Sequence, residues 1–452
     1  MAEPPKRTVQ RNARLGALPV GMAGRAAAGW MRRVAGADRA EVAAELAVRN
    51  ADQIFEVLGE LKGGAMKLGQ ALSVYETLIP NELAEPYHQA LIKLQANAPQ
   101  MPAKDVHRML GEQLGRDWSR RFAEFDAEHA HAASIGQVHR AIWHDGREVA
   151  VKLQYPGADE ALSSDLRTLQ RFAWLLQRIV PGADVRALLQ EISDRMIEEL
   201  DYAAEADNQR AFAAALAGDQ RVRVPKVVGS APKVIISEWL EGTPLSRFAH
   251  QPIANDRDRS IRDHIGETMI ELGFSSPARV GLLHSDPHHG NFRLLTDGRI
   301  GMLDFGAVVR LPDGIPPPLG RILRLAADDE PEQLLEMLCV EGFVGRADRV
   351  SPEDVMAMLG AFTHPLRDRP FHYNRAFLQA EGGRLINFQG NDFKTAQSMS
   401  LPPQYLMILR VVVGWMSILG QIDCRVDSRG IVERWVPGFN SFDPRPTPTS
   451  EV

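Results

Sequence analysis

The chain has 452 residues, of which 44% are hydrophobic and 24% are charged, and its formal net charge is −6. It is long enough for two or three packed units, its composition is that of a soluble globular protein, and its negative charge excludes a general nucleic-acid binder. The two cysteines, Cys339 and Cys424, are far apart, which argues against a disulfide framework or a zinc site and fits a reducing cytoplasm.

Residues 1–40 are basic, with eight Lys or Arg residues against Glu3 and Asp38. They lack the apolar core of a signal peptide. Two interpretations stay open for this segment: an amphipathic helix on an anionic membrane, or a solvated tail that folds back on the body of the protein. The predicted location is therefore cytoplasmic, with peripheral contact at the inner face of a membrane as an open alternative.

Apolar residues recur at helical spacing after residue 41, and this pattern predicts helices up to residue 128. The pattern changes near residue 131, where two β-rich runs flank the turn sequence HDG and predict a hairpin. Residues 221–242 are again strand-like, whereas 160–216 are strongly helical. The order of the elements thus predicts helices followed by a small sheet with an inserted helix.

Beyond residue 243 the chain reads as mostly helical, with a short strand pair within 292–306. The longest apolar run, 405–422, contains Arg410, and this charge predicts a buried core helix; no transmembrane helix is predicted. The predicted domains are a basic segment, a helical extension, a lobe with a small sheet, a helical lobe and a disordered tail, at 1–40, 41–128, 129–242, 243–440 and 441–452.

The sequence LLHSDPHHGNF, residues 282–292, places Asp286, two histidines and Asn291 in one short stretch, and Asp304 follows in LDFGA. H-x-D-x-x-x-x-N followed by D-F-G indicates kinase-type phosphoryl transfer. Asp286 would orient the attacking hydroxyl or water, while Asn291 and Asp304 would be magnesium ligands. The alternative is an ordinary polar turn capped by Asp286. A zinc site is disfavoured because no cysteine or H-E-x-x-H pattern accompanies the histidines.

A kinase-like site needs a strand lysine upstream, and EVAVKLQYPG supplies Lys152. Its ammonium would contact the α- and β-phosphates and would be held by a helix acid. The segment RMIEELDYAAEADN offers Glu199, Asp201 and Glu205, of which the last two are four residues apart and share a helix face. The alternative for Lys152 is an ordinary residue of an edge strand.

The expected phosphate loop lies before this lysine, in AHAHAASIGQVHRA. Backbone N–H groups there can cradle phosphate, although alanine restricts the positive φ that glycine permits. The candidate loop residues are Ala132, Ala133, Ser134, Ile135 and Gly136. Backbone groups between Glu238 and Leu240 are the candidates for reading the nucleotide base, by their position between the two lobes.

Six motifs in order carry a family resemblance. LKGGAMKLGQALS at 61–73 contains K-x-G-Q, and AASIGQVHRA, VAVKLQYPG, EELDYAAEADN, LLHSDPHHGNF and MLDFGA follow it. With these motifs the chain resembles the UbiB/AarF/ADCK atypical kinase-like family from about residue 50 to residue 310. The resemblance implies an α+β fold, bilobal and protein-kinase-like, with an N-terminal helical extension.

The resemblance also implies binding of ATP or ADP with Mg²⁺. The implied activity is that of an ATPase or a small-molecule kinase that supports isoprenoid-quinone biosynthesis or lipid homeostasis at membranes. Lys67 and Gln70 of K-x-G-Q would reach into the active site near the acids Glu199 and Asp201. Lys152 would pair with Glu205. The implied partners are the nucleotide, a lipid or quinone-pathway small molecule or its enzymes, and an anionic membrane surface, but no nucleic acid.

The chain departs from the protein-kinase pattern at several positions. Ser285 replaces the arginine of H-R-D, and no A-P-E-like segment follows Asp304, so phosphorylation of an activation loop is not expected to control the protein. His288 stands where protein kinases have a lysine that faces the γ-phosphate. A histidine supplies less positive charge at neutral pH, so we expect slow transfer. His289 stands where the family usually has proline.

Three functions stay open at this point. The complete set of nucleotide-site residues favours a magnesium-dependent ATPase or kinase that acts on a lipid-related small molecule. The altered phosphate loop, His288 and the K-x-G-Q segment favour a nucleotide-regulated pseudokinase scaffold for a lipid or quinone biosynthetic complex. A protein kinase is the least favoured, because the K-x-G-Q segment is expected to lie over the protein-substrate site.

Overall fold

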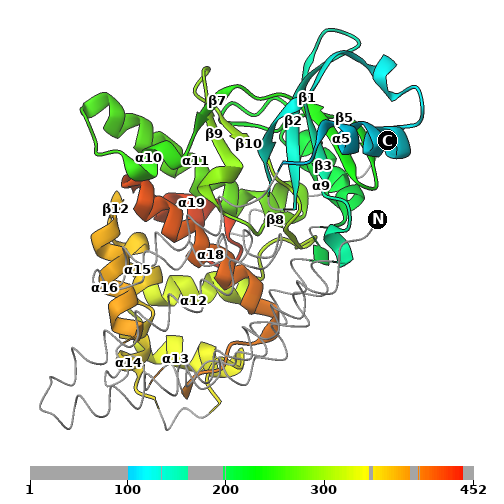
Figure 1. Ribbon diagram of the computed structural model, residues 1–452. Helices are drawn as coiled ribbons and strands as arrows, with labels where there is room; N and C mark the ends of the chain where they lie inside the picture. Colours follow the sequence, from blue (N-terminus) through cyan, green and yellow to red (C-terminus); the bar gives the residue numbers. More distant parts are fainter. Residues whose placement is uncertain are drawn as a thin grey trace, which may run out of the picture. The chain divides into compact units, whose positions relative to one another are not determined.

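The computed structural model describes residues 100–133, 135–160, 197–198, 200–345, 350–386, 395 and 398–440 (Figure 1). The chain divides into two compact units: Met1–Gly146 with Val151–Asp201, and Arg147–Ala150 with Tyr202–Val452. The predictions for the basic segment, for the extension before residue 100 and for the tail lie outside the described residues, as do Lys67, Gln70, Ser134 and Glu199. The predicted lobes, 129–242 and 243–440, stay a prediction.

The first unit is built on a long antiparallel hairpin. Its elements are helix α5 (Ala103–Leu114), the 3-10 turn η2 (Trp118–Arg121), strands β1 (Phe122–Ala132) and β2 (Gly136–Trp143), and strand β3 (Glu148–Gln154) from Val151 onward. β1 pairs with β2 from Phe122 opposite Trp143 to Ala132 opposite Gln137. An aromatic cluster lies at the end of the hairpin away from its connecting loop. Its rings, mostly edge-on to one another, are those of Trp118, Phe122, Phe125 and Trp143.

The helical prediction is wrong for residues 122–128, which belong to β1. Glu124, Asp126 and Glu128 alternate there with smaller or aromatic residues. That is the period of two that a strand requires, because successive side chains point to opposite faces. The predicted hairpin around HDG is confirmed: β3 lies beside β2, and Gly146 in the connecting turn has φ +86°.

The second unit contains helix α9 and two groups of short strands. The bounds are α9 (Tyr202–Ala215), β4 (Val222–Arg223), β5 (Val227–Ala231), β6 (Val234–Glu238), β7 (Gly242–Pro244), β9 (Phe292–Leu295) and β10 (Ile300–Met302). β5 and β6 form a hairpin, and the order β4-β10-β9-β7 makes a second sheet. Both strand predictions, for 221–242 and for the pair after residue 292, are confirmed.

Helices make up most of the remainder of this unit (Figure 1). They are α10 (Ser246–His250), α11 (Asp256–Val280), α12 (Pro317–Ala327), α13 (Pro331–Val340), α14 (Pro352–Met358), α15 (Gly360–Arg367), α16 (Arg375–Ile386), α18 (Pro403–Ile422) and α19 (Ser428–Trp435). Short strand pairs connect them: β8 (Leu282–His284) with β11 (Val308–Arg310), and β12 (Phe371–Tyr373) with β13 (Cys424–Val426).

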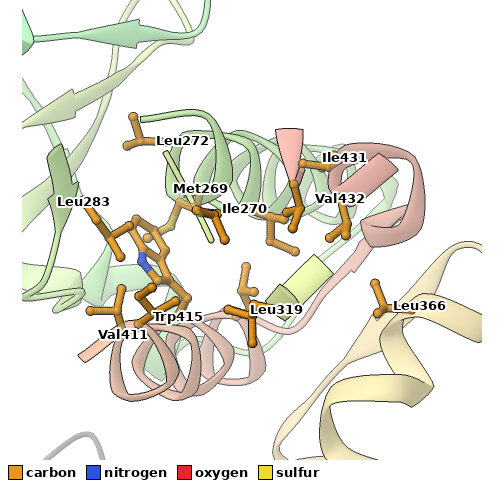
Figure 2. Close-up of a cluster of buried hydrophobic side chains, with 14 of the residues drawn as sticks. Met269, Ile270, Leu272, Leu283, Leu319, Leu366, Val411, Trp415, Ile431 and Val432 are labelled. Carbon is orange, nitrogen blue, oxygen red and sulfur yellow. The ribbon is translucent and has the colours of Figure 1, made fainter. Parts of the chain in front are cut away.

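The hydrophobic core of the second unit lies between α11, α18 and α19. Figure 2 shows part of it, with these labelled side chains: Met269, Ile270, Leu272, Leu283, Leu319, Leu366, Val411, Trp415, Ile431 and Val432. Gly266 of α11 permits a close approach to β13, since a Cβ there would lie 2.4 Å from Sγ of Cys424. The core therefore fixes α11, whose C-terminal end leads into the site described below.

Within the described residues, one helical stretch, Gln404–Ile422 of α18, is long and apolar enough to cross a membrane by length and composition. A buried core helix meets the same criterion, and 56% of its apolar window is buried inside the protein. The packing of Val411 and Trp415 in the core supports the predicted core helix.

Candidate functional site

The loop of residues 284–291 joins β8 to the η3 turn (His289–Asn291) and carries the first acidic motif. α11 ends at Gly281, whose φ of +74° turns the chain into β8. β8 is then held by β11, and the N–H of Ser285 donates to the carbonyl of Ala307 at 3.1 Å. The N–H of His288 closes the next turn on the carbonyl of Asp286 at 2.8 Å. The backbone thus fixes the position of Asp286.

Asp286 and Asn291, five residues apart in the motif, lie in direct contact. Nδ2 of Asn291 donates to Oδ2 and to the backbone carbonyl of Asp286, both at 3.1 Å. Because the amide nitrogen makes these contacts, Oδ1 of Asn291 is the atom not used in them. Both side chains are half-buried. This arrangement holds a carboxylate and an amide oxygen at the surface of one loop.

Asp304 lies next to this pair. The N–H of Leu303 donates to the carbonyl of Asn291 at 3.0 Å, and the N–H of Gly306 donates to Oδ1 of Asp304 at 3.0 Å. A hairpin therefore brings the two acidic motifs together, although Asp304 follows Asn291 by thirteen positions in the chain. Carboxylate and amide oxygens are the donors that magnesium prefers, so the residues present fit this ion.

His284 connects the H-x-D motif to the D-F-G motif through a hydrogen bond. Its Nε2 lies 2.8 Å from the carbonyl of Asp304, and because a carbonyl only accepts, Nε2 carries the hydrogen. The side chain is 2% exposed, and its ring lies edge-on to Phe292 and to Phe305. Sequence reasoning used His284 only as a letter of the H-x-D pattern and assigned it no role. The signal was its place directly after two buried leucines.

Asn208 of α9 is a second residue that sequence reasoning missed. It is 7% exposed, and its Nδ2 donates to the carbonyl of Phe305 at 3.1 Å. Glu205 is on the same helix, three residues earlier, and is also buried. The helix that carries this predicted acid is thus anchored to the backbone of the D-F-G segment. A buried asparagine in a helix needs a partner, and this could have been the signal.

The candidate phosphate loop of the first unit is narrower than predicted. β1 continues to Ala132 and β2 begins at Gly136, so both ends of the predicted loop belong to strands. The N–H of Ala133 donates to the carbonyl of Gly136 at 2.9 Å, and the N–H of Tyr155 donates to the carbonyl of Ile135 at 3.0 Å. The loop is therefore a tight hairpin connection that is also tied to the end of β3.

Lys152 lies on β3 and is half-buried, between the buried Val151 and Leu153. Two residues further on, Gln154 is 2% exposed and donates from Nε2 to the carbonyl of Leu200 at 2.9 Å. Leu200 directly precedes Asp201, so this bond ties the lysine-bearing strand to the start of the acidic segment. Sequence reasoning missed Gln154. The pairing of Lys152 with Glu205 stays a prediction.

The segment from Glu238 to Leu240 is held by its neighbours in the second unit. The N–H of Trp239 donates to the carbonyl of Glu148 at 3.0 Å, and the carboxylate of Glu238 accepts from the N–H of Lys226 at 3.2 Å. Leu240 is 5% exposed and packs on β10, where a Cβ at Gly301 would lie 3.0 Å from it. The role of this segment in reading a base stays a prediction.

His288 turns back into its own loop. Its Nδ1 accepts from the N–H of Gly290 at 3.1 Å, and its ring lies 4.4 Å from that of His289. This contact keeps Nδ1 of His288 within its own loop. In the described part of the chain, no three or more His, Cys, Asp or Glu side chains gather as metal ligands.

The chain is similar to several known proteins. The model of the ABC1 atypical kinase-like domain matches residues 93–338, more than half of the chain. The chain is 30% identical to the Caenorhabditis elegans protein named atypical kinase coq-8, mitochondrial, over 75% of this chain and 46% of the relative. It is 31% identical to atypical kinase COQ8B, mitochondrial, of Danio rerio, over 68% of this chain and 49% of that protein. The chain thus spans about half the length of the curated relatives that it matches.

A solved structure extends the similarity. The Mycobacterium tuberculosis protein in a structure described as the complex of Rv3197 with erythromycin is 46% identical, with a TM-score of 0.66. The alignment covers 89% of this chain and 99% of that one. The α+β, protein-kinase-like fold predicted from the sequence is confirmed, and so is the resemblance. The chain belongs to the ABC1 atypical kinase-like family, which includes the COQ8 atypical kinases.

Proposed function

We propose that the chain binds ATP or ADP with Mg²⁺ and either hydrolyses ATP or transfers its γ-phosphoryl group to a small molecule. The observation that carries this proposal is the contact between Asp286 and Asn291, with Asp304 held beside them by the bond from Leu303 to Asn291. Family membership supports it, since the relatives are named atypical kinases.

The three residues have separate roles in this proposal. Asp286 accepts the proton of the attacking hydroxyl or water and orients it. Asp304 and Oδ1 of Asn291 hold magnesium, which when bound neutralises charge on the phosphate oxygens. The contact from Asn291 to Oδ2 of Asp286 fixes the rotamer of the base. The bond from His284 holds the backbone of Asp304 in place.

Lys152 and the loop between β1 and β2 are the proposed contacts to the phosphates. We assign Lys152 to the α- and β-phosphates, and the backbone N–H groups of the loop between β1 and β2 to the phosphate tail. Glu205 would hold the lysine. Lys67 and Gln70 of the K-x-G-Q segment would act near Glu199 and Asp201. These assignments rest on the order of the motifs in the chain.

The relatives of the chain suggest a class of substrate. Because its relatives are COQ8 proteins, we propose that the substrate or the dependent pathway is that of an isoprenoid quinone or a lipid. The M. tuberculosis relative adds erythromycin, a macrolide, as a candidate ligand. We place the chain in the cytoplasm or at a membrane surface, with the basic residues 1–40 as the contact to anionic lipid.

A second candidate function is a nucleotide-regulated scaffold for a lipid or quinone biosynthetic complex. The observation that favours it is the contact of Nδ1 of His288 with the N–H of Gly290, which holds this side chain in its own loop. A histidine supplies less positive charge at neutral pH than the lysine that protein kinases have there, so transfer would be slow. A protein kinase is the least favoured function.

Turnover distinguishes the two candidates. ATP hydrolysis by the full chain is measured with magnesium, with and without anionic liposomes, beside an Asp286→Asn variant. We expect hydrolysis that rises with liposomes and falls about 10²-fold or more in the variant, the usual effect of losing a general base. Nucleotide binding without turnover in either condition would favour the scaffold. Hydrolysis that is unchanged in the variant would remove Asp286 from the mechanism.

A further inference from the structure

A series of hydrogen bonds that involve buried side chains lies next to the candidate phosphate loop. The N–H of Met101 donates to Oε1 of Gln137 at 2.7 Å, and Nε2 of Gln137 lies 2.8 Å from Nε2 of His139. Nδ1 of His139 lies 2.9 Å from the carbonyl of Asp126. Gln137 is 1% exposed and His139 is fully buried. Gln137 directly follows Gly136, the residue that closes the loop.

The direction of every bond in this series is determined by chemistry. The carbonyl of Asp126 only accepts, so Nδ1 of His139 carries a hydrogen. In the neutral ring Nε2 is then an acceptor, and the amide nitrogen of Gln137 donates to it. This leaves Oε1 of Gln137 to accept from Met101, which is the arrangement observed. One neutral tautomer of His139 therefore sets the orientation of the Gln137 amide.

Met101 lies at the entry to α5, within the predicted helical extension. A second bond ties the same place to the hairpin: Nε2 of Gln100 donates to the carbonyl of Ala130 at 2.9 Å. The segment that enters α5 is thus attached to both strands that flank the loop. The structure also ties the loop on its other side, from Ile135 to Tyr155.

We propose that Gln137 is a positioning residue that locks the phosphate loop to the segment entering α5, and that the neutral ring of His139 holds this lock closed. The proposal deepens the proposed function, because it assigns a cause to the conformation of the loop that would hold the nucleotide. A protonated His139 has hydrogens on both ring nitrogens, so its Nε2 faces the Gln137 amide nitrogen as donor against donor. Turning the amide relieves this conflict but sets its nitrogen against the N–H of Met101. Protonation thus breaks one of the two bonds.

Burial lowers the pKa of His139 below its ordinary value of 6.5, while the bond to the carbonyl of Asp126 opposes this. The lock therefore stays closed at neutral pH and opens only at a pH below the ordinary pKa of a histidine. The groups that act on the ring are Asp126, His129 and His131 of β1, and Nδ1 of His129 lies 2.7 Å from Oδ2 of Asp126. The neighbouring α5 and β3 carry the ionisable residues Lys104, Asp105, His107, Arg108, Glu112, Glu148 and Lys152.

The test measures the affinity of the full chain for Mg-ADP by calorimetry between about pH 5.5 and 8, a range that spans the ordinary pKa of histidine. The wild-type affinity should be constant at high pH and fall about ten-fold at low pH, the effect of one lost buried hydrogen bond. Gln137→Leu should bind about ten-fold more weakly at every pH, with a flat profile. His144→Asn, which changes an exposed histidine in the turn after β2, should keep the wild-type profile. A Gln137→Leu variant with wild-type affinity and profile would overturn the proposal.

A second measurement needs neither a variant nor a nucleotide. Hydrogen exchange of the wild-type chain, corrected for intrinsic rates, should show that the amides of Met101 and Ala133 lose protection together as the pH falls. Loss of protection at Ala133 alone, or at neither amide, would overturn the lock. If wild-type binds no nucleotide at any pH while both amides respond, the proposed function fails and the lock stands.

Discussion

Gln137 and His139 of the first unit are almost completely buried, whereas Asp286, Asn291 and Asp304 of the second unit are half-buried. In the first cluster, side chains hold one another, and each bond has one possible direction. In the second, backbone bonds such as that from Leu303 to Asn291 do most of the positioning. Buried polar side chains therefore specify the structure in the first cluster, whereas the backbone positions Asp286 and Asp304 in the second.

Arg262, a buried cation in the second unit, offers the strongest test of whether buried polar side chains specify the structure. It is 2% exposed and donates to the carbonyls of Phe248, Ile422 and Gln251 at 2.6, 2.6 and 2.7 Å. Arg262→Met should lower the free energy of unfolding by about 3–5 kcal/mol, because the carbonyls and the nearby Asp258 lose their partner. Guanidinium unfolding measures this, with the exposed Arg257→Met as the control. A change below about 1 kcal/mol would show that burial does not mark structural polar residues here.

Gly414 tests whether the backbone presents the acids. A Cβ at this position of α18 would lie 2.6 Å from Cγ of Pro287, the residue after Asp286. Gly414→Ala should displace the loop and reduce ATP hydrolysis by about ten-fold or more, since small misplacements of catalytic groups are costly. Gly273→Ala is the matched control, because its Cβ would meet Trp415 at an ordinary 3.5 Å. Equal activity of the two variants would contradict the role of this packing contact.

Asp219 should show a smaller effect, because its burial is intermediate. Burial raises the pKa of its carboxyl, but the N–H groups of Arg221 and Val222 and the guanidinium of Arg279 outweigh this and lower it. A lowered pKa means that the stabilisation is present above the ordinary pKa of 3.8 and is lost as the pH falls through the lower folded value. Asp219→Asn should cost about 1–2 kcal/mol at pH 7, and the difference should shrink below about pH 4.

The control for Asp219 is Asp207→Asn. That aspartate pairs with Arg210 at 2.7 Å, but its side chain is 77% exposed. Exposed pairs contribute little, so the change should stay below about 0.5 kcal/mol at any pH. Unfolding by urea at several pH values measures both variants. Equal losses for the two would remove burial as the variable that separates them.

The acidic motifs could be predicted from the sequence because their contacts are local. Asp286 and Asn291 are five residues apart, and one hairpin brings Asp304 beside them. The hairpin around HDG and the strands at 221–242 were predictable for the same reason, since turn residues and alternation are short-range signals. The strand at 122–128 was assigned to a helix because its alternating acids were overlooked.

The long-range hydrogen bonds of buried amide side chains could not be predicted from the sequence. Gln137 is thirty-six residues from Met101, Gln154 is forty-six from Leu200, and Asn208 is ninety-seven from Phe305. Nothing in the local pattern around a glutamine or asparagine says which distant carbonyl or N–H it will meet. Burial decides this, because an enclosed amide must find partners wherever the fold places them.

The most direct test of the proposed magnesium–nucleotide site is thermal stabilisation of the full chain by ATP. It is measured with and without magnesium, in wild-type and in Asp304→Asn. We expect magnesium to raise the wild-type melting temperature in the presence of ATP, and this increment to vanish in Asp304→Asn without loss of the unliganded transition. Asp297→Asn, on the exposed turn of the same hairpin, should keep the wild-type increment. An unchanged magnesium-dependent increment in Asp304→Asn would contradict the assignment of this site.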